Sequence, residues 1–246
     1  MQELQGKAAI VTGGSRGIGA AIARRLAEDG ADVAITYHAS EDRARETVAA
    51  VEAVGRRGRA IRADSADPAA LSAAVDEAAA AFGRLDILVN NAGIFPYGPP
   101  DAVSLEEIDR TLAIHVRAPY VAAQAALRHM ADGGRIISIG SCLAQRAAGP
   151  GVALYAMSKS ALVGFSKGLA RDVGSRGITV NVVDPGATDT DMNPAGSDDA
   201  DAQRSLSALR RFAAPAEIAA VVAFLAGPGG AFVTGAAIAA DGGFAA

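Results

Sequence analysis

The sequence predicts a single-domain α/β fold, with a doubly wound, seven-stranded parallel sheet and helices on both faces. Short apolar runs alternate with longer stretches of helical period, which is the pattern of repeated strand–helix–strand units. Ala8–Val11 and Ile87–Val89 are apolar throughout, as strands buried on both faces must be. The 246 residues contain no proline- or serine-rich linker and no internal repeat, so we expect one domain over residues 1–246.

The individual elements follow from local composition. Strands are expected where runs rich in apolar and β-branched residues lie between glycines or polar residues: Lys7–Thr12, Asp32–Tyr37, Arg59–Ala63, Asp86–Asn90, Arg135–Gly140, Thr179–Val183 and Ala236–Ala240. Helices are expected over stretches of helical period, several of which open with Ser, Asp or Pro: Ile18–Asp29, Glu41–Val54, Pro68–Phe82, Leu105–Met130, Leu154–Ser175 and Pro215–Leu225.

Residues 187–212 interrupt this rhythm. The segment is polar, contains five aspartates and lies between a strand and the last helix. It follows the carboxyl end of a strand, where ligands bind in open α/β sheets. We therefore expect a substrate-binding lid, with a solvated loop as the alternative.

Composition excludes several classes of function. The 23 basic and 27 acidic side chains give a formal charge of −4, which provides no general attraction to nucleic acid or anionic lipid. Cys142 is the only cysteine, and His38 and His129 have no ligand neighbours at metal-binding spacing, so we expect neither a disulfide within the chain nor a metal site. Residues 1–7 lack a targeting segment, so the expected location is cytoplasmic, without a membrane anchor.

A glycine-rich turn joins the first strand to the first helix, over Thr12–Gly19. Backbone amides in such a turn can approach a pyrophosphate closely, and the helix N-terminus adds a favourable dipole. Glycines alone are weak support, since tight strand–helix turns also need them. The position directly after the first strand favours nucleotide binding.

Tyr155 and Lys159 are spaced to share one helix face. An ammonium beside a phenol favours the phenolate and lowers the pKa of the tyrosine, which makes the pair a candidate general acid/base. A surface tyrosine beside a solvated lysine is the alternative interpretation.

Four motifs in order complete a pattern: Gly-x-x-x-Gly-x-Gly at Gly13, Gly17 and Gly19, then Asn90-Asn91-Ala92-Gly93, Tyr155-x-x-x-Lys159 and Pro185-Gly186. Together they resemble the short-chain dehydrogenase/reductase family over essentially the whole chain, and most closely its 3-oxoacyl-[acyl-carrier-protein] reductases. The resemblance implies a Rossmann fold and hydride transfer between nicotinamide and a carbonyl or alcohol group. It also implies pairing of subunits through the helices at Leu105–Met130 and Leu154–Ser175, in a homotetramer or homodimer.

The resemblance assigns catalytic roles to four positions. It implies that Tyr155 is the general acid/base, that Lys159 lowers its pKa and binds the nicotinamide ribose, and that Ser141 hydrogen-bonds the substrate oxygen. Ser138 competes with Ser141, but Ser141 lies at the strand's carboxyl end. His115 stands where the family has an asparagine that helps to hold a water of a proton relay. A working relay, a reshaped pocket and a core histidine in a weakened enzyme remain open for this residue.

The second strand ends in Tyr37-His38-Ala39-Ser40, without the acid that NAD-selective members carry, which favours NADP(H) over NAD(H). Arg16, with His38 and Ser40, is the candidate partner of the 2′-phosphate. By resemblance, Asp64 contacts adenine, and Thr190, or alternatively Thr188, binds the carboxamide. The expected cofactor-binding residues are Gly13, Ser15, Arg16, Gly17, Ile18, Gly19, His38, Ser40, Asp64, Ser65, Asn91, Ala92, Gly93, Tyr155, Lys159, Pro185, Gly186, Thr188 and Thr190.

These residues predict an NADP(H)-dependent oxidoreductase acting on a small ketone or a 3-oxoacyl substrate. If the substrate is bound to acyl carrier protein, candidate docking residues are Arg128, Arg171, Arg204, Arg210 and Arg211. The alternative is a catalytically weakened NADP(H)-binding sensor or regulatory protein on the same fold.

Overall fold

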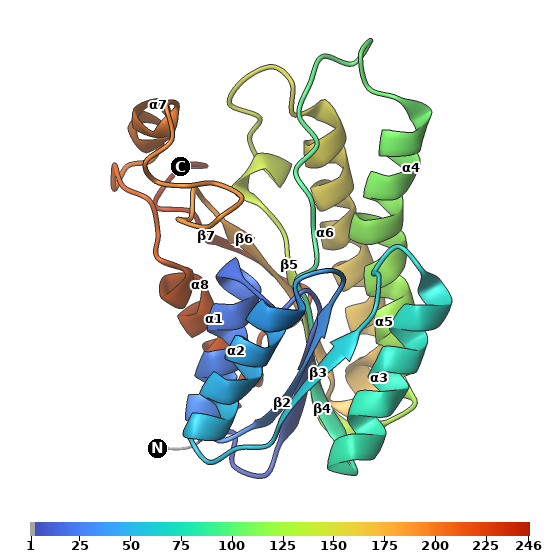
Figure 1. Ribbon diagram of the computed structural model, residues 1–246. Coiled ribbons are helices and arrows are strands. Elements are labelled where there is room, and N and C mark those ends of the chain that lie inside the picture. Colours follow the sequence, from blue (N-terminus) through green and yellow to red (C-terminus); the bar gives the residue numbers. More distant parts are fainter. Residues whose placement is uncertain (1–2) are drawn as a thin grey trace.

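The computed structural model describes residues 3–246, in which seven parallel strands form one sheet (Figure 1). The strands are β1 (Ala8–Val11), β2 (Asp32–Tyr37), β3 (Gly58–Arg62), β4 (Leu85–Asn90), β5 (Met130–Ile139), β6 (Thr179–Pro185) and β7 (Ala237–Ala240). Their order is β3-β2-β1-β4-β5-β6-β7, which reverses direction between β1 and β4. The predicted doubly wound sheet is confirmed, and ligands bind at the point of reversal in such sheets.

Helices cover both faces of the sheet. They are α1 (Gly17–Glu28), α2 (Glu41–Ala53), α3 (Pro68–Phe82), α4 (Leu105–Leu112), α5 (Ala118–Leu127), α6 (Ala153–Val173), α7 (Ala200–Leu206) and α8 (Pro215–Ala226). The part of the chain that the structure describes also contains four short helical segments: a π-helical one, η1 (Ala113–Arg117), and three 3₁₀ turns, η2 (Cys142–Ala144), η3 (Gly174–Arg176) and η4 (Pro228–Gly230). Figure 1 shows α1, α2 and α8 against one face of the sheet and α3, α5 and α6 against the other.

Two hydrophobic cores result, one on each face. Successive strand residues point to opposite faces, so Ile10 packs with α3, α5 and α6, whereas Val11 packs with α1 and α8. Leu88 and Val89 divide in the same way. This alternation explains why the central strands are apolar throughout.

The predicted helix Leu105–Met130 is wrong in its continuity and at its end. It divides into α4, η1 and α5, and Met130 begins β5, where it pairs with Leu85 of β4. Pro119 has no N–H to donate to the carbonyl of His115, four residues earlier, so a regular α-helical ladder cannot pass this point. His115 therefore lies in the π-helical segment η1, which joins α4 to α5.

The segment 187–212 lies at the carboxyl edge of the sheet and contains one short helix, α7, which the sequence analysis did not predict (Figure 1). Two isolated bridges hold the segment's base, between Thr188 and Ala213 and between Thr190 and Asn193. Within residues 3–246, no helix is long and apolar enough to cross a membrane.

Candidate active site

The glycine turn is fastened to the loop that follows β4. The Asn91 side-chain amide donates to the carbonyls of Thr12 at 2.9 Å and Gly13 at 3.0 Å. The Thr12 hydroxyl accepts from the backbone N–H groups of Asn91 and Ala92 at 3.0 and 3.1 Å. Gly13 adopts a left-handed φ of 63°, which places its N–H against the Thr36 hydroxyl at 3.1 Å. These bonds join the glycine turn after β1 to the loop after β4, at the point where the strand order reverses.

The start of α1 suits a phosphate group. Its first turn, Gly17-Ile18-Gly19-Ala20, carries no acidic side chain in the sequence, and its N-terminal N–H groups face the carboxyl edge of the sheet. Gly19 packs beneath the Asn91 amide, so that a Cβ at this position would overlap the side chain. This donor set fits the pyrophosphate of a dinucleotide.

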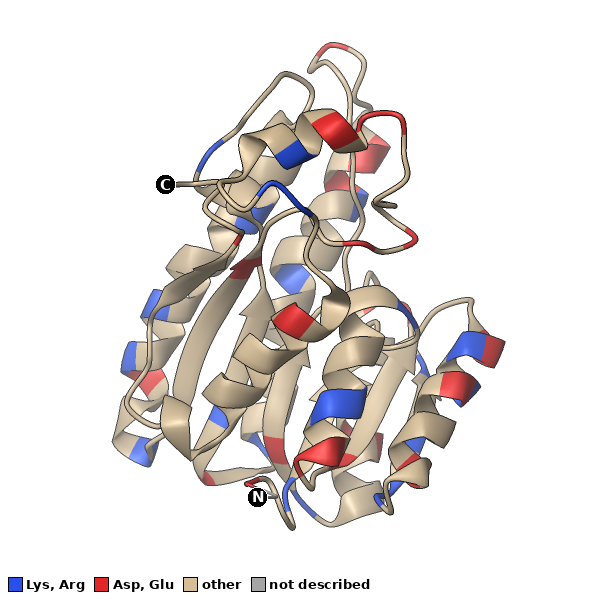
Figure 2. Cartoon of the chain, turned by 90° about the vertical axis from the view of Figure 1, so that its left-hand side faces the viewer, with Lys and Arg blue, Asp and Glu red and all other residues tan. Residues whose placement is uncertain are grey.

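Polar residues surround the end of β2. The His38 imidazole lies 3.4 Å from the Asp64 carboxylate, and Ser40 precedes α2. Arg16, about half exposed, lies 3.8 Å from Asp191, which also pairs with Arg43. Acidic and basic positions are intermingled on the face that carries α1, α2, α7 and α8 (Figure 2).

Segment 187–193 lies against the glycine turn. The Thr190 methyl carbon is within 3.3 Å of the position that a Cβ on Gly17 would take. The Thr188 hydroxyl donates to the Gly186 carbonyl at 3.0 Å, so this side chain is engaged with its own loop. The geometry therefore brings Thr190, rather than Thr188, against the glycine turn.

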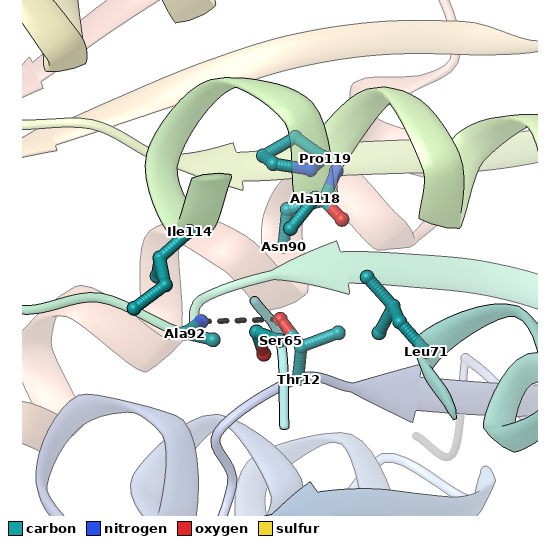
Figure 3. A pocket seen from close by; sticks show the side chains of 8 residues that line it. All are labelled: Thr12, Ser65, Leu71, Asn90, Ala92, Ile114, Ala118 and Pro119. Atoms are coloured by element: carbon teal, nitrogen blue, oxygen red, sulfur yellow. Dashed lines mark hydrogen bonds between the residues drawn. The ribbon is translucent and has the colours of Figure 1, made fainter. Parts of the chain in front are cut away.

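Ser65 lines a small cavity with Thr12, Asn90 and Ala92, in which the Thr12–Ala92 hydrogen bond is visible (Figure 3). Its volume of about 10 Å³ suits a single water molecule rather than an organic ligand. A larger cavity of about 200 Å³ lies between the ends of β6 and β7, α8 and residues 209–213, and neither the glycine turn nor Tyr155 lines it.

Ser141, Tyr155 and Lys159 converge at the end of β5. The Lys159 ammonium donates to the Ile139 carbonyl at 2.8 Å and lies 5.8 Å from the centre of the Tyr155 ring. Ser141 lies two residues beyond the last residue of β5, directly before η2, and its hydroxyl accepts from the Leu143 N–H at 3.1 Å. The competing Ser138 is fully buried within β5 and accepts from the Asn90 amide at 3.3 Å. Ser141 is thus the serine at the site.

Burial dominates the protonation of the tyrosine and the lysine. Burial of the hydroxyl raises the pKa of Tyr155 to about 12, although the Ser141 side chain counteracts this in part. Burial also lowers the pKa of Lys159 to about 8, against the opposing influence of Asp184. The sequence led us to expect that Lys159 lowers the Tyr155 pKa, but the net shift is upward and Lys159 is not among the groups that lower it; its ammonium lies over the Tyr155 ring.

His115 is a buried, neutral bridge. Its Nε2 accepts from the Ile94 N–H at 3.0 Å, which makes Nδ1 the protonated nitrogen and the donor to the Ser158 hydroxyl at 2.8 Å. The Ser158 hydroxyl in turn donates to the Tyr155 carbonyl at 2.7 Å. Burial, with the Lys159 charge, lowers the pKa of His115 to about 3. Both ring nitrogens are engaged, so a water relay through the imidazole would have to displace one of these bonds.

Sequence reasoning missed several residues that lie around Ser141, Tyr155 and Lys159. Ser158 and Gln145 carry no motif signal, and Phe95 becomes relevant only because its ring meets Tyr155 edge-on, with centroids 4.8 Å apart. Asp184 could have been noticed in the sequence, because it is a charged residue directly after the apolar run Val182–Val183. Cys142 is buried, which raises the pKa of its thiol to about 12 and makes it an inert neighbour.

The chain is similar to known proteins over nearly its whole length. The profile of a family described as enoyl-(acyl carrier protein) reductase matches residues 13–245. The chain is 47% identical, over the full length of both proteins, to the cyclic-di-GMP-binding biofilm dispersal mediator protein of Escherichia coli (strain K12). It is 40% identical to the hydroxynaphthalene reductase-like protein Arp2 of Metarhizium brunneum, over 98% of this chain and 96% of that protein.

Among solved structures, a short-chain dehydrogenase from Burkholderia cenocepacia in complex with NADP is 60% identical, with a TM-score of 0.98. The match covers 99% of this chain and 100% of that one. The family profile, the fold and the ordered motifs lead to one conclusion: this chain belongs to the short-chain dehydrogenase/reductase family.

Proposed function

We propose that this protein is an NADP(H)-dependent reductase of carbonyl groups, with Tyr155 as its proton donor. The observation that carries the proposal is the convergence of Ser141, Tyr155 and Lys159 at the sheet edge beside the glycine turn. A protein that only binds a nucleotide has no need of a proton donor at this place. The raised pKa of Tyr155 keeps the hydroxyl protonated at neutral pH, which suits the reductive direction.

The residues present fit NADP(H). The α1 N-terminus and glycine turn would hold the pyrophosphate, Arg16, His38 and Ser40 the 2′-phosphate, and Thr190 the carboxamide. The NADP complex of the Burkholderia cenocepacia relative supports this choice. When bound, the cofactor supplies a hydride to the carbonyl carbon.

The chain's own residues supply the proton and the orientation. Tyr155 donates its hydroxyl proton to the substrate oxygen, while the Ser141 hydroxyl, which accepts from Leu143, directs its own proton at the same oxygen. The Lys159 ammonium balances the phenolate that remains. We assign His115 a positioning role, since its bridge through Ser158 fixes the backbone of Tyr155.

An aromatic surface leads away from Tyr155. Phe95 lies against Tyr155, and Tyr97 stacks on Phe95 with centroids 6.2 Å apart and an interplanar angle of 18°. Both side chains are partly exposed, at 44% and 66%. This surface supports a ketone with an apolar or aromatic body, as does the name of the hydroxynaphthalene reductase-like relative.

Delivery of a 3-oxoacyl substrate by acyl carrier protein has weaker support. Three of the five candidate docking arginines already pair with carboxylates: Arg128 with Asp76, Arg204 with Asp201 and Arg211 with Glu217. We therefore favour a small, freely diffusing ketone. Segment 187–212, whose base lies against the glycine turn, is the proposed lid over this substrate.

The regulatory alternative rests on one observation, the 47% identity to a protein named for cyclic-di-GMP binding and biofilm dispersal. On this alternative the chain binds a nucleotide and transmits its presence to a partner, with Tyr155 idle. Tight binding of NADPH or cyclic di-GMP without turnover of any ketone would favour it.

We propose a cytoplasmic homotetramer or homodimer. Tyr120 of α5 is 61% exposed and contacts Phe165 of α6, which leaves an aromatic pair on the outer helices. A monomer mass in multi-angle light scattering would contradict the assembly.

The proposed activity is tested by following NADPH absorbance with a panel of ketones, β-ketoesters, quinones and cyclic diketones, with Tyr155→Phe as the matched control. We expect oxidation of NADPH by the wild type with at least one aromatic or cyclic ketone, and almost none by the variant. Equal rates for the two proteins would refute the role of Tyr155.

A further inference from the structure

A carboxylate is buried at the catalytic edge of the sheet. Asp184, at the end of β6, is 0% exposed. Its Oδ1 accepts from the Ser141 backbone N–H at 3.0 Å, and its Oδ2 accepts from the Gln145 side-chain amide at 2.8 Å. Burial of a charge destabilises a protein unless partners compensate for the lost water, and here both carboxylate oxygens have such a partner.

The fold makes room for this carboxylate. A Cβ on Gly140, the residue before Ser141, would overlap Asp184 Oδ1. Gly140 also donates its N–H to the Val183 carbonyl at 2.7 Å, which holds the end of β5 against β6. The glycine therefore allows the carboxylate to lie directly beneath the backbone that carries the Ser141 hydroxyl.

The charged and titratable groups around Asp184 come from three elements. α6 contributes Lys159 and Tyr155, η2 contributes the Cys142 thiol, and the end of β7 is followed by Asp241. Lys159 is the cation among them, and its charge favours the ionised form of Asp184. The Asp184 charge in turn raises the pKa of both Tyr155 and Lys159.

We propose that Asp184 is a positioning residue for the proton transfer by Tyr155: its carboxylate fixes the backbone of Ser141 and supplies the negative charge that the buried Lys159 faces. The inference rests on the proposed function, because it assumes that Tyr155 transfers the proton. It predicts that the pH range of activity depends on a residue that touches neither substrate nor cofactor.

Asp184→Asn tests the proposal with little change of shape. The asparagine keeps an oxygen for the Ser141 N–H, and Gln145 turns its amide to accept from the new side-chain N–H. Reduction needs the protonated tyrosine and the charged Lys159, so activity is lost as pH rises through the lower of the two pKa values, that of Lys159, which is about 8. Removing the Asp184 charge lowers the pKa of both groups, and we expect the alkaline limb of kcat/KM for ketone reduction to move down by roughly one pH unit.

Two further variants complete the test. Asp241→Asn removes the neighbouring buried carboxylate, which accepts from the Gly243 and Ala245 N–H groups at 2.9 Å, and should leave the limb in place. Gln145→Glu adds a negative charge beside Asp184 from an exposed position, which keeps the test available if Asp184→Asn does not fold. It should move the limb to higher pH.

A second readout does not need turnover. Ultraviolet difference titration of the tyrosines, with the matching Tyr155→Phe protein as the subtraction standard, measures the ionisation of Tyr155 directly. We expect the Tyr155 transition to shift down in Asp184→Asn and to stay unchanged in Asp241→Asn. If the proposed function fails, no variant reduces a ketone but this shift still tests the contact. The inference is overturned if the wild type reduces ketones normally and Asp184→Asn moves neither the alkaline limb of the pH profile nor the ionisation transition of Tyr155.

Discussion

Replacement of His115 by asparagine separates a structural role from a proton relay. The imidazole makes two hydrogen bonds, from the Ile94 N–H at 3.0 Å and to Ser158 at 2.8 Å, and is 1% exposed. Asparagine is too short to span both partners. Loss of one bond and an unpaired N–H at Ile94 together destabilise the fold by about 2–4 kcal/mol. For a domain of this size, the expected fall in Tm is roughly 4–16 °C.

The assay pairs circular-dichroism melting with kcat for ketone reduction, measured well below the lowered Tm. We expect the melting temperature to fall and turnover to persist, because the ring nitrogens serve Ile94 and Ser158 rather than a water chain. Ser158→Ala, which cuts the same bridge from its other end, should reproduce a smaller fall. An unchanged Tm with collapsed turnover would refute this reasoning and restore the relay.

The same residue predicts how stability depends on pH. Burial holds the pKa of His115 near 3, below its ordinary value of 6.5, so between these values the unfolded chain binds a proton that the folded chain does not. Stability from His115 is therefore complete above about pH 6.5 and falls on acidification, by at most about 1.4 kcal/mol per pH unit. Denaturant unfolding from pH 7 to 4 should show a shallower slope for His115→Asn; an identical slope would contradict the assignment.

Three further outcomes are expected. Tyr155→Phe should lower kcat by about 10²- to 10⁴-fold and leave the Kd for NADPH nearly unchanged in fluorescence titration. Arg16→Ala should weaken NADPH binding by about tenfold without changing NADH binding; an equal loss for both would remove Arg16 from the 2′-phosphate site. Asp86→Asn should destabilise the fold by about 1–3 kcal/mol in urea unfolding, because Asp86 accepts from Ala8 and Arg84. Although burial opposes it, these bonds hold the pKa of Asp86 below 3.8, so the deficit should vanish as pH falls through that lowered pKa.

The sequence predicts an element accurately where neighbouring residues in the chain fix its first and last residues. The bounds of α3, Pro68–Phe82, were predicted as observed because Asp67 caps the first turn, accepting from two backbone N–H groups, and Gly83 ends the helix with a φ of 75°. The helix through His115 was predicted wrongly because its apolar period continues across Pro119, and the start of β5 at Met130 depends on pairing with Leu85, which no local pattern encodes.

The candidate site likewise contains residues that the sequence located and contacts that only the structure shows. Spacing along one helix face located Tyr155 and Lys159, whereas Ser141 was located by the family resemblance and by its place at the carboxyl end of a strand. The sequence did not locate the contacts of Asp184 with Ser141, which join residues 43 positions apart. The sign of the Tyr155 pKa shift was also beyond it, because spacing gives the distance to a charge but not the extent of burial.

Transfer of deuterium from NADPH labelled at the reactive nicotinamide carbon is the most direct test that this chain reduces ketones through Tyr155. Mass spectrometry of the product from an aromatic ketone should find one deuterium on the carbinol carbon with the wild type, and only trace product with Tyr155→Phe. Unlabelled product, no product with any ketone of the panel, or equal labelled product from both proteins would contradict the proposed reaction.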